Sequence, residues 1–262
     1  MRDNRSSEQT PGSEQDCFGR LAQEALSNLV SARVQRRTEV RQHDLQYFMA
    51  LLSRPGVDDP AAILTDMLDR NLDPEAVAQC YVPAAARVLG KQWEADEITF
   101  VDVTVRTERL HGIVRFVDEL ASTGEKPRTA SCLILVPEGE QHTLGAFVLA
   151  LQLRIAGFSA AVRIEPTAAE LTRLIGGARF DVALISVGCE TGLASAPALV
   201  KLLRRLAHDG LRIIVGGSSP LSDDTLLAAS GADGVARDIT EFIKDFGGTH
   251  VADGLNVRSR KA

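Results

Sequence analysis

Short apolar runs alternate with amphipathic stretches through the second half of this 262-residue chain. The apolar runs predict strands at residues 131–136, 159–164, 181–186, 211–215 and 233–236. A helical period follows each run and predicts helices at 144–156, 167–177, 195–208, 220–229 and 238–247. Strands that alternate with helices form parallel sheets with helices on both faces. We therefore predict an α/β domain over residues 129–248, with a Rossmann-like (flavodoxin-like), five-stranded, doubly wound parallel sheet.

The first half of the chain shows mainly the helical period. Apolar positions recur every three or four residues from Phe18 onward and predict a helical bundle, or cap, over residues 17–122. Asp73 followed by Pro74 is typical of a helix start, because aspartate caps the first turn and proline fits its first position. Pro83 should kink the helix that begins there.

Residues 98–105 present a conflict between two predictions. Their β-branched, partly alternating pattern favours a strand, whereas the continuation to Leu120 has helical spacing. A solitary strand inside a helical bundle would leave its backbone groups unpaired. We therefore predict a helix for the whole segment.

Composition marks the ends of the chain and the junction between its halves. Residues 1–16 are polar and predict a disordered tail, residues 123–128 are typical of a linker, and residues 249–262 form a basic tail. No internal repeat is visible. The polar start and the lack of a long apolar run indicate a cytoplasmic protein.

Charge and motif content exclude several function classes. The net charge is −6 and the pI is about 5.5, which argues against a dedicated nucleic-acid binder. The four cysteines form no Cys-x-x-Cys pair, so neither a disulfide framework nor a zinc site is indicated. The sequence has no Ser/His/Asp set, P-loop or metal-hydrolase motif, and we predict that the protein is not an enzyme.

The polar stretch from Glu140 to Gly145 carries the main candidate chemistry. It follows the first predicted strand, and ligands bind at the carboxyl ends of strands in open α/β sheets. Glu140 precedes His142 by two residues and can accept its second ring N–H, which fixes the tautomer that a metal-ligating imidazole needs. Taken alone, a single loop histidine such as His142 is more often solvated than a ligand.

Two further strand ends extend this pattern. Ser186 follows Gly145 after 40 residues, and Gly216-Gly217 follows Gly188 after 27. The set resembles the cobalamin (vitamin B12) binding domain, whose signature is Asp-x-His-x-x-Gly, then Ser-x-Leu, then Gly-Gly. Glu140 replaces the aspartate of this signature, and Gly188 replaces the leucine.

The resemblance implies a role for each of these positions. His142 would replace dimethylbenzimidazole as the lower cobalt ligand, with Glu140 orienting it. Ser186 would hydrogen-bond the displaced nucleotide tail, and the glycines Gly216 and Gly217 would leave it room. By position, Gly145 belongs to the same site, and Val187, Gly188 and Cys189 line the slot. Cys189 could instead be a small buried hydrophobe.

The helical half adds a second resemblance around the only tryptophan. The run from Val88 to Ile98 resembles the helical cap of methionine synthase and of cobalamin photoreceptors, where the tryptophan packs over the corrin ring. Trp93 could otherwise be a core residue. The photoreceptors carry a Glu-His pair whose histidine is the upper cobalt ligand, and Val103-Thr104 replaces that pair here. His111 could substitute, but we expect it on the bundle surface.

Together the two halves resemble the aerobic antirepressor (AerR/PpaA) family of purple phototrophic bacteria over residues 45–245. The resemblance implies a light-responsive regulator that binds hydroxocobalamin or adenosylcobalamin. It would act by contact with a DNA-binding, CrtJ/PpsR-like repressor of photosynthesis genes, without binding specific DNA or membranes itself. Two alternatives are a corrinoid methyl carrier of a methyltransferase system and a heme or other tetrapyrrole sensor. The row of Arg33, Arg37 and Arg41 could be a solvated helix face or a partner-docking surface.

Overall fold

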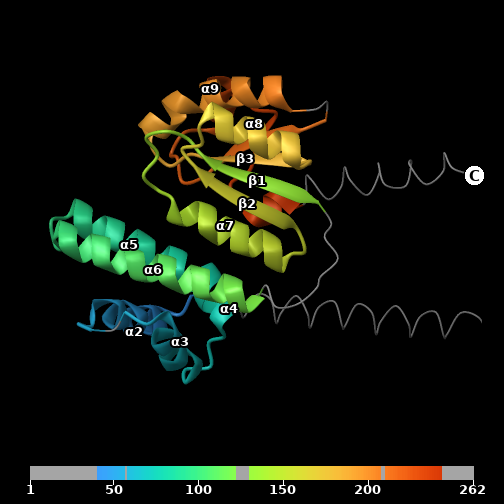
Figure 1. Cartoon of the computed structure of the whole chain (residues 1–262). Helices are drawn as coiled ribbons and strands as arrows, with labels where there is room; N and C mark the ends of the chain where they lie inside the picture. Colours follow the sequence, from blue (N-terminus) through green and yellow to red (C-terminus); the bar gives the residue numbers. More distant parts are fainter. Residues whose placement is uncertain (1–39, 57, 122–129, 208–209, 244–262) are drawn as a thin grey trace, which may run out of the picture.

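A computed structural model describes residues 40–56, 58–121, 130–207 and 210–243 (Figure 1). The helix predicted from Phe18, with Arg33 and Arg37, lies outside the described residues, as do both predicted tails and the predicted linker. The described chain forms two layers of different composition. A helical bundle packs beneath an α/β layer whose strands lie between helices (Figure 1).

The five predicted strands are all present and form one parallel sheet in the order β2-β1-β3-β4-β5. Their bounds are β1 Ser131–Val136, β2 Ser159–Ile164, β3 Val182–Ser186, β4 Arg212–Gly216 and β5 Gly234–Val235. The helices between them are α7 Leu144–Ile155, α8 Ala168–Gly177, α9 Glu190–Leu206 and α10 Asp223–Ser230. The strand order and the alternation confirm the predicted doubly wound, flavodoxin-like fold.

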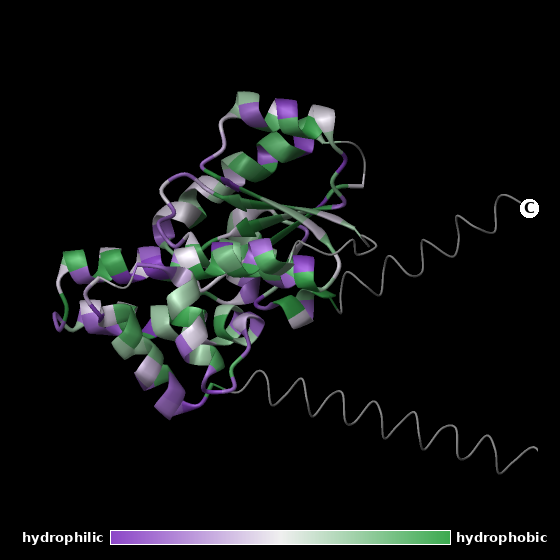
Figure 2. Ribbon diagram, turned by 60° about the horizontal axis from the view of Figure 1, so that its bottom comes forward, coloured by the Kyte–Doolittle hydropathy of each residue, from purple (hydrophilic) through white to green (hydrophobic). Residues whose placement is uncertain are grey.

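Each face of the sheet has its own hydrophobic core, because side chains alternate along a strand. Leu133 and Leu135 of β1 pack with apolar residues of α8, α9 and α10. Cys132 and Ile134 pack on the other face with α7 and with Phe242, in a final helical segment at residues 239–243. Strands β1, β3 and β4 are accordingly mainly apolar, and the sheet in Figure 2 is coloured largely green and white.

Six elements of the bundle lie in the described residues. They are α2 Gln42–Ser53, α3 Pro60–Leu68, α4 Pro74–Ala76, the π-helix η1 Val77–Tyr81, α5 Val82–Glu94 and α6 Phe100–Ala121. Asp73 accepts a hydrogen bond from the backbone N–H of Ala76, which confirms the predicted helix start. The π-helical turn lies directly before Pro83, where a ring without an N–H disturbs the regular ladder.

Helix α6 resolves the conflict at residues 98–105 in favour of a helix from Phe100 onward, and residues 98 and 99 precede it. Thr99 and Asp102 form a reciprocal cap: the Asp102 N–H donates to Thr99 Oγ1, and the Thr99 N–H donates to the Asp102 carboxylate. This cap satisfies backbone donors that the first turn leaves free. It therefore begins a helix despite the β-branched residues that follow.

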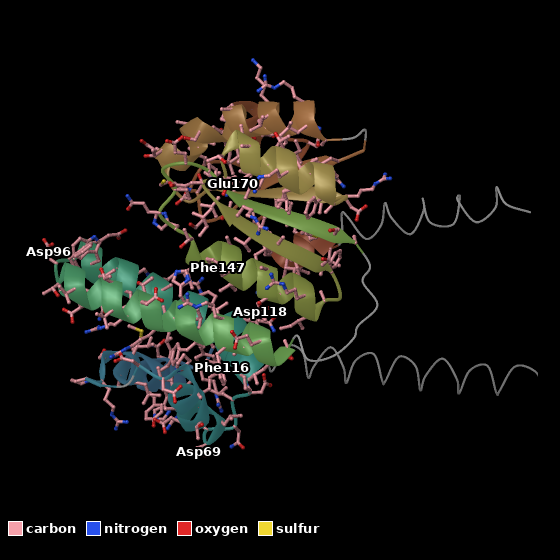
Figure 3. All side chains as sticks on the ribbon, in the orientation of Figure 1. Asp69, Asp96, Phe116, Asp118, Phe147 and Glu170 are labelled. Carbon is pink, nitrogen blue, oxygen red and sulfur yellow. The ribbon has the colours of Figure 1, made fainter. Side chains whose placement is uncertain are left out.

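Helix α7 belongs to both halves of the molecule. Its Ala146, Ala150 and Leu153 face the sheet, whereas Leu144 and Leu151 lie in the core of the bundle together with Val148. An ion pair between Arg154 of α7 and Asp118 of α6 joins the same surfaces, which lie side by side in Figure 3. Burial on two sides explains why α7 is apolar almost all round. None of the described helices combines the length and apolar character that a membrane span requires.

Candidate functional site at the carboxyl edge of the sheet

A tight turn after β1 brings Glu140 into the interior. The Glu140 N–H donates to the carbonyl of Pro137 at 3.2 Å, and Gly139 adopts φ +78°, a conformation that glycine accepts without strain. The side chain of Glu140 is completely buried, although its neighbours in the loop, Gln141 and His142, are exposed. Burying a carboxylate is costly unless hydrogen bonds compensate it.

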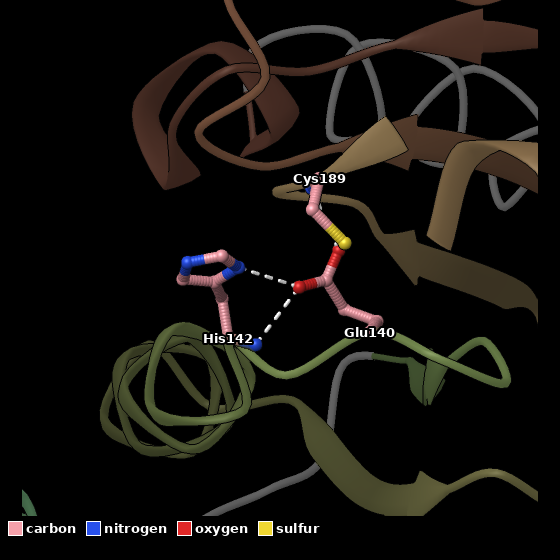
Figure 4. A group of neighbouring side chains, drawn as sticks. All are labelled: Glu140, His142 and Cys189. Atoms are coloured by element: carbon pink, nitrogen blue, oxygen red, sulfur yellow. Dashed lines mark hydrogen bonds and ion pairs between the residues drawn. The ribbon is translucent and has the colours of Figure 1, made fainter. Parts of the chain in front are cut away.

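Four N–H donors offset the cost of burying the Glu140 carboxylate, and Figure 4 shows the two that belong to His142. Oε1 accepts from the backbone N–H of His142 at 2.8 Å and from His142 Nδ1 at 2.7 Å. Oε2 accepts from the backbone N–H groups of Gly188 at 2.6 Å and Cys189 at 2.9 Å, where α9 begins. Burial alone would raise the pKa of the Glu140 carboxyl, but the hydrogen bonds from Gly188, His142 and Cys189 lower the pKa from 4.5 to about 2.

The ionised Glu140 determines the state of the histidine. Because a carboxylate only accepts hydrogen bonds, Nδ1 of His142 must donate, and Nε2 of the neutral ring keeps its lone pair. The side chain of His142 is 65% exposed, and Nε2 has no hydrogen-bond partner among the described residues. The hydrogen bond between Glu140 and His142 is the one that the sequence spacing predicted, and the use of Nε2 as a metal ligand stays a prediction.

Two glycines make room for this pair. A Cβ on Gly188 would lie 3.1 Å from Nδ1 of His142, and a Cβ on Gly192 would lie 2.6 Å from Oε2 of Glu140. Close packing against His142 gives a physical reason for a glycine at 188, where the cobalamin signature has leucine. Gly192 was not predicted, because a glycine in the first turn of a helix has no distinctive sequence signal.

Cys189 completes a cluster with Glu140 and His142 in which the potential ligand atoms lie within 4.8 Å of one another. Both oxygens of Glu140 are already engaged by N–H donors. The Cys189 Sγ accepts from the N–H of Gly192 at 3.4 Å and caps α9, so the residue is a half-buried helix cap and not the buried hydrophobe considered as an alternative. The cluster thus presents one outward ligand atom, Nε2, which suits an axial ligand better than a three-residue chelate.

The remaining predicted residues gather at neighbouring strand ends. Ser186 ends β3 opposite Gly216 of β4. A Cβ on Gly216 would lie 2.1 Å from the carbonyl oxygen of Ala236, and Gly217 has φ +127°. The backbone packing itself therefore requires both glycines, and their role toward a nucleotide tail stays a prediction.

The other two positions differ in exposure. Val187 is fully buried, and its N–H donates to the Gly216 carbonyl at 2.8 Å, so its side chain belongs to the core. Gly145 is exposed, and a Cβ there would meet no atom within 4 Å. Open space above Gly145, one turn from His142 on the same loop and helix, is compatible with a large planar ligand.

The cap contributes an exposed aromatic pair. Trp93 is 44% exposed and Phe100 is 68% exposed, with ring centroids 6.2 Å apart in an edge-to-face arrangement. Trp93 is therefore not a core residue. The α5–α6 hairpin tip, marked by Asp96 in Figure 3, lies on the same side of the molecule as the loop from β1 to α7 (Figure 1).

We had expected His111 to lie on the bundle surface, but the structure places it elsewhere. It is half-buried where α6 meets α7, edge-to-face with Phe147 at 5.4 Å and with Nε2 at 3.5 Å from Thr143 Oγ1. Burial lowers the pKa of His111, which favours the neutral ring. Thr104, at the position of the photoreceptor histidine, donates its hydroxyl hydrogen bond to the Phe100 carbonyl at 2.8 Å.

The predicted arginine row is only partly described. Nε of Arg41 pairs with the buried carboxylate of Asp44 at 2.6 Å, and Arg41 also donates to the carbonyl of Arg70. These contacts tie Arg41 to α2 and to the residues that follow α3. They leave Arg41 less suited to partner docking than the sequence pattern suggested.

Comparison with known proteins agrees with this geometry. The family model described as B12 binding domain matches residues 130–244, the whole described sheet layer. An uncharacterized 20.5 kDa protein from the bchF–crtJ intergenic region of Rhodobacter capsulatus is 36% identical over 174 residues, which cover 66% of this chain and 91% of that protein. The chain belongs to the same family as this Rhodobacter capsulatus protein and carries a B12 binding domain.

A solved structure shows the same architecture. The monomethylamine corrinoid protein of Methanosarcina barkeri superposes with a TM-score of 0.60 at 16% identity, over 78% of this chain and 97% of that protein. The superposition extends beyond the B12 binding domain into the helical half. It supports the fold of a helical region followed by a five-stranded parallel sheet.

Proposed function

We propose that this B12-binding-domain protein is a cobalamin-dependent regulator in which His142 is the lower cobalt ligand. The observation that carries the proposal is the Glu140–His142 pair. Glu140 is buried, ionised and held by four N–H groups, so it fixes the one tautomer of His142 that can coordinate through Nε2. Such a carboxylate–histidine pair raises the basicity of the ligand nitrogen.

The other residues fit the remaining parts of cobalamin. Ser186 and the glycines Gly216 and Gly217 lie at adjoining strand ends, where a nucleotide tail displaced by His142 would enter. The exposed rings of Trp93 and Phe100 offer apolar surface to the opposite face of a corrin. When bound, cobalamin supplies a cobalt with an exchangeable upper position and, in alkyl forms, a light-sensitive cobalt–carbon bond.

We further propose hydroxocobalamin, or adenosylcobalamin after illumination, as the form that this site accepts. Val103-Thr104 supplies no imidazole where the photoreceptors have one, and the hydroxyl of Thr104 is engaged with Phe100. His111 packs against Phe147. An upper position without a protein nitrogen favours water or hydroxide.

The proposed output is protein contact with a CrtJ/PpsR-like repressor, by which the chain acts as an antirepressor and not as an enzyme. Two observations support it: the related protein is encoded beside crtJ, a photosynthesis regulator, and the net charge of −6 disfavours DNA binding. Helix α7 can transmit a movement of His142 to the cap, because it begins directly after His142 and Thr143 and shares the core of the bundle. A shift at His142 can thereby reach the cap, to the extent that cobalamin binds two states with different affinity.

A pull-down against the purified repressor tests this function. We expect capture that differs between cobalamin-free and hydroxocobalamin-loaded protein, and loss of that difference in His142→Ala. Capture independent of cobalamin, or sequence-specific DNA binding by this chain alone, would contradict the regulator. An absorption spectrum separates a corrinoid from heme, and a methyl-transfer assay with a partner methyltransferase tests the methyl-carrier alternative.

A further inference from the structure

The turn that presents Glu140 is held by a residue from another strand. Gly139 occupies the third position of the turn from Pro137 to Glu140, with φ +78° as in a type II turn. In such a turn the N–H of the third residue points away from the turn and can donate to an acceptor outside it. That acceptor is Oε1 of Glu165, at 2.9 Å from the Gly139 nitrogen.

Glu165 adopts an unusual conformation to reach this position. It follows β2 with φ +46°, in the left-handed region that residues with a Cβ rarely occupy, and Pro166 restricts its backbone further. Its own N–H donates to the Val136 carbonyl at 2.9 Å, which extends the pairing of β2 with β1 by one bond. Strain that is retained at one such position often marks a functional constraint.

The opposite side of the turn is also fixed. A Cβ on Gly139 would lie 2.6 Å from Cγ2 of Thr191, and Cys189 Sγ lies 3.7 Å from the Gly139 carbonyl oxygen. The turn is therefore held between the end of β2 and the start of α9. Glu140, the next residue, receives its position from this clamp.

We propose that Glu165 is a positioning residue for the proposed cobalt ligand. The chain of contacts runs from the Glu165 carboxylate to the Gly139 N–H, through the adjoining peptide to Glu140, and from Glu140 to Nδ1 of His142. Loss of the first contact frees the turn and loosens the carboxylate that orients the imidazole. The inference rests on the proposed function for its effect on cobalamin, but not for its effect on the Glu140–His142 pair.

Three substitutions separate the hydrogen bond from the strain. Glu165→Gly removes the acceptor and relieves the positive φ, and Glu165→Asn tolerates the same backbone but is one methylene shorter. Glu165→Gln loses the charge and keeps an oxygen acceptor at the same reach. Glu138→Gln, which removes an exposed carboxylate from the same turn, is the matched control for charge.

Two readouts are compared in all variants. Side-chain ¹⁵N NMR of cobalamin-free protein reports the His142 tautomer, assigned with His142→Ala. Titration with hydroxocobalamin reports affinity and the lower-ligand absorption bands.

We expect Glu165→Gly and Glu165→Asn to stay folded, to lose the single tautomer, and to bind about 3- to 10-fold more weakly, the range for one lost hydrogen bond. Glu165→Gln and Glu138→Gln should match the wild type. Wild-type tautomer and affinity in whichever of the Gly and Asn variants folds would overturn the inference. Failure of the wild type to bind cobalamin would instead reject the proposed function, while the tautomer readout still tests Glu165.

Discussion

The two sides of the candidate site are built in opposite ways. At the strand ends, the carboxylate of Glu140 is buried and each of its oxygens has two N–H partners. On the cap, Trp93 and Phe100 are partly exposed among the described residues, and their rings meet edge to face. Within the described residues, folding thus pairs the polar side completely, whereas part of the apolar side stays exposed and open to a ligand or a partner.

The difference follows from what each kind of group costs. An unpaired buried carboxylate is so unfavourable that its donors must be in place in the folded protein. Exposed aromatic area costs only about 25 cal/mol per Å² relative to burial, so a fold tolerates it. The polar side should therefore determine ligand geometry, and the apolar side should add affinity.

Among the substitutions that test this comparison, Glu140→Gln should have the largest effect on cobalamin affinity. The amide places an N–H₂ group among donors, so the pair with His142 loses its orientation and cobalamin affinity should fall about 10- to 100-fold. Isothermal titration with hydroxocobalamin measures the effect, with Glu138→Gln as the exposed control. Unchanged affinity in Glu140→Gln would show that the buried carboxylate does not support the ligand.

The pH dependence of stability tests the role of the buried Glu140 carboxylate without any ligand. The folded-state pKa of Glu140 is depressed to about 2 from 4.5, so the folded protein resists protonation more than the unfolded chain does. The stability that this carboxylate contributes is complete above about pH 4.5 and is lost as the pH falls toward 2, at about 1.4 kcal/mol per pKa unit. Urea unfolding of wild type and Glu140→Gln should show a stability difference that shrinks across this window, and a constant difference would contradict the assignment.

The smallest effect is expected on the cap side. Trp93→Ala should weaken cobalamin binding about 3- to 10-fold through lost apolar contact. Its free energy of unfolding should change by no more than about 0.5 kcal/mol, because the ring is partly exposed. Leu68→Ala, at an equally exposed apolar position of α3, is the control for both measurements. Unfolding of Trp93→Ala would mean that the tryptophan is structural.

Periodicity was sufficient to predict the sheet. Apolar runs located all five strands because a buried parallel strand has few polar positions, and the conflict at residues 98–105 was resolved by asking where its backbone groups could pair. Helix α9 was predicted to begin at residue 195 but begins at Glu190. Its first turn contains a glycine and is capped by cysteine, which gives no strong helix signal.

Contacts between segments that are distant in the chain could not be predicted from the sequence. Spacing predicted that Glu140 orients His142, because both lie in one loop. The donors from Gly188 and Cys189 and the clamp by Glu165 depend on strand ends meeting at one edge of the sheet. The position of His111 against Phe147 was missed for the same reason, since it depends on how α7 packs into the bundle.

The identity of the axial nitrogen is the most direct test of the proposed site. The protein is labelled with ¹⁵N-histidine, loaded with unlabelled cobalamin, reduced to the cobalt(II) state and measured by electron paramagnetic resonance. Coordination by His142 predicts that each cobalt line is split into a doublet by ¹⁵N, and that the doublet is absent in His142→Ala. A triplet from ¹⁴N in the labelled protein would show that dimethylbenzimidazole remains on the cobalt and would contradict His142 as the lower ligand.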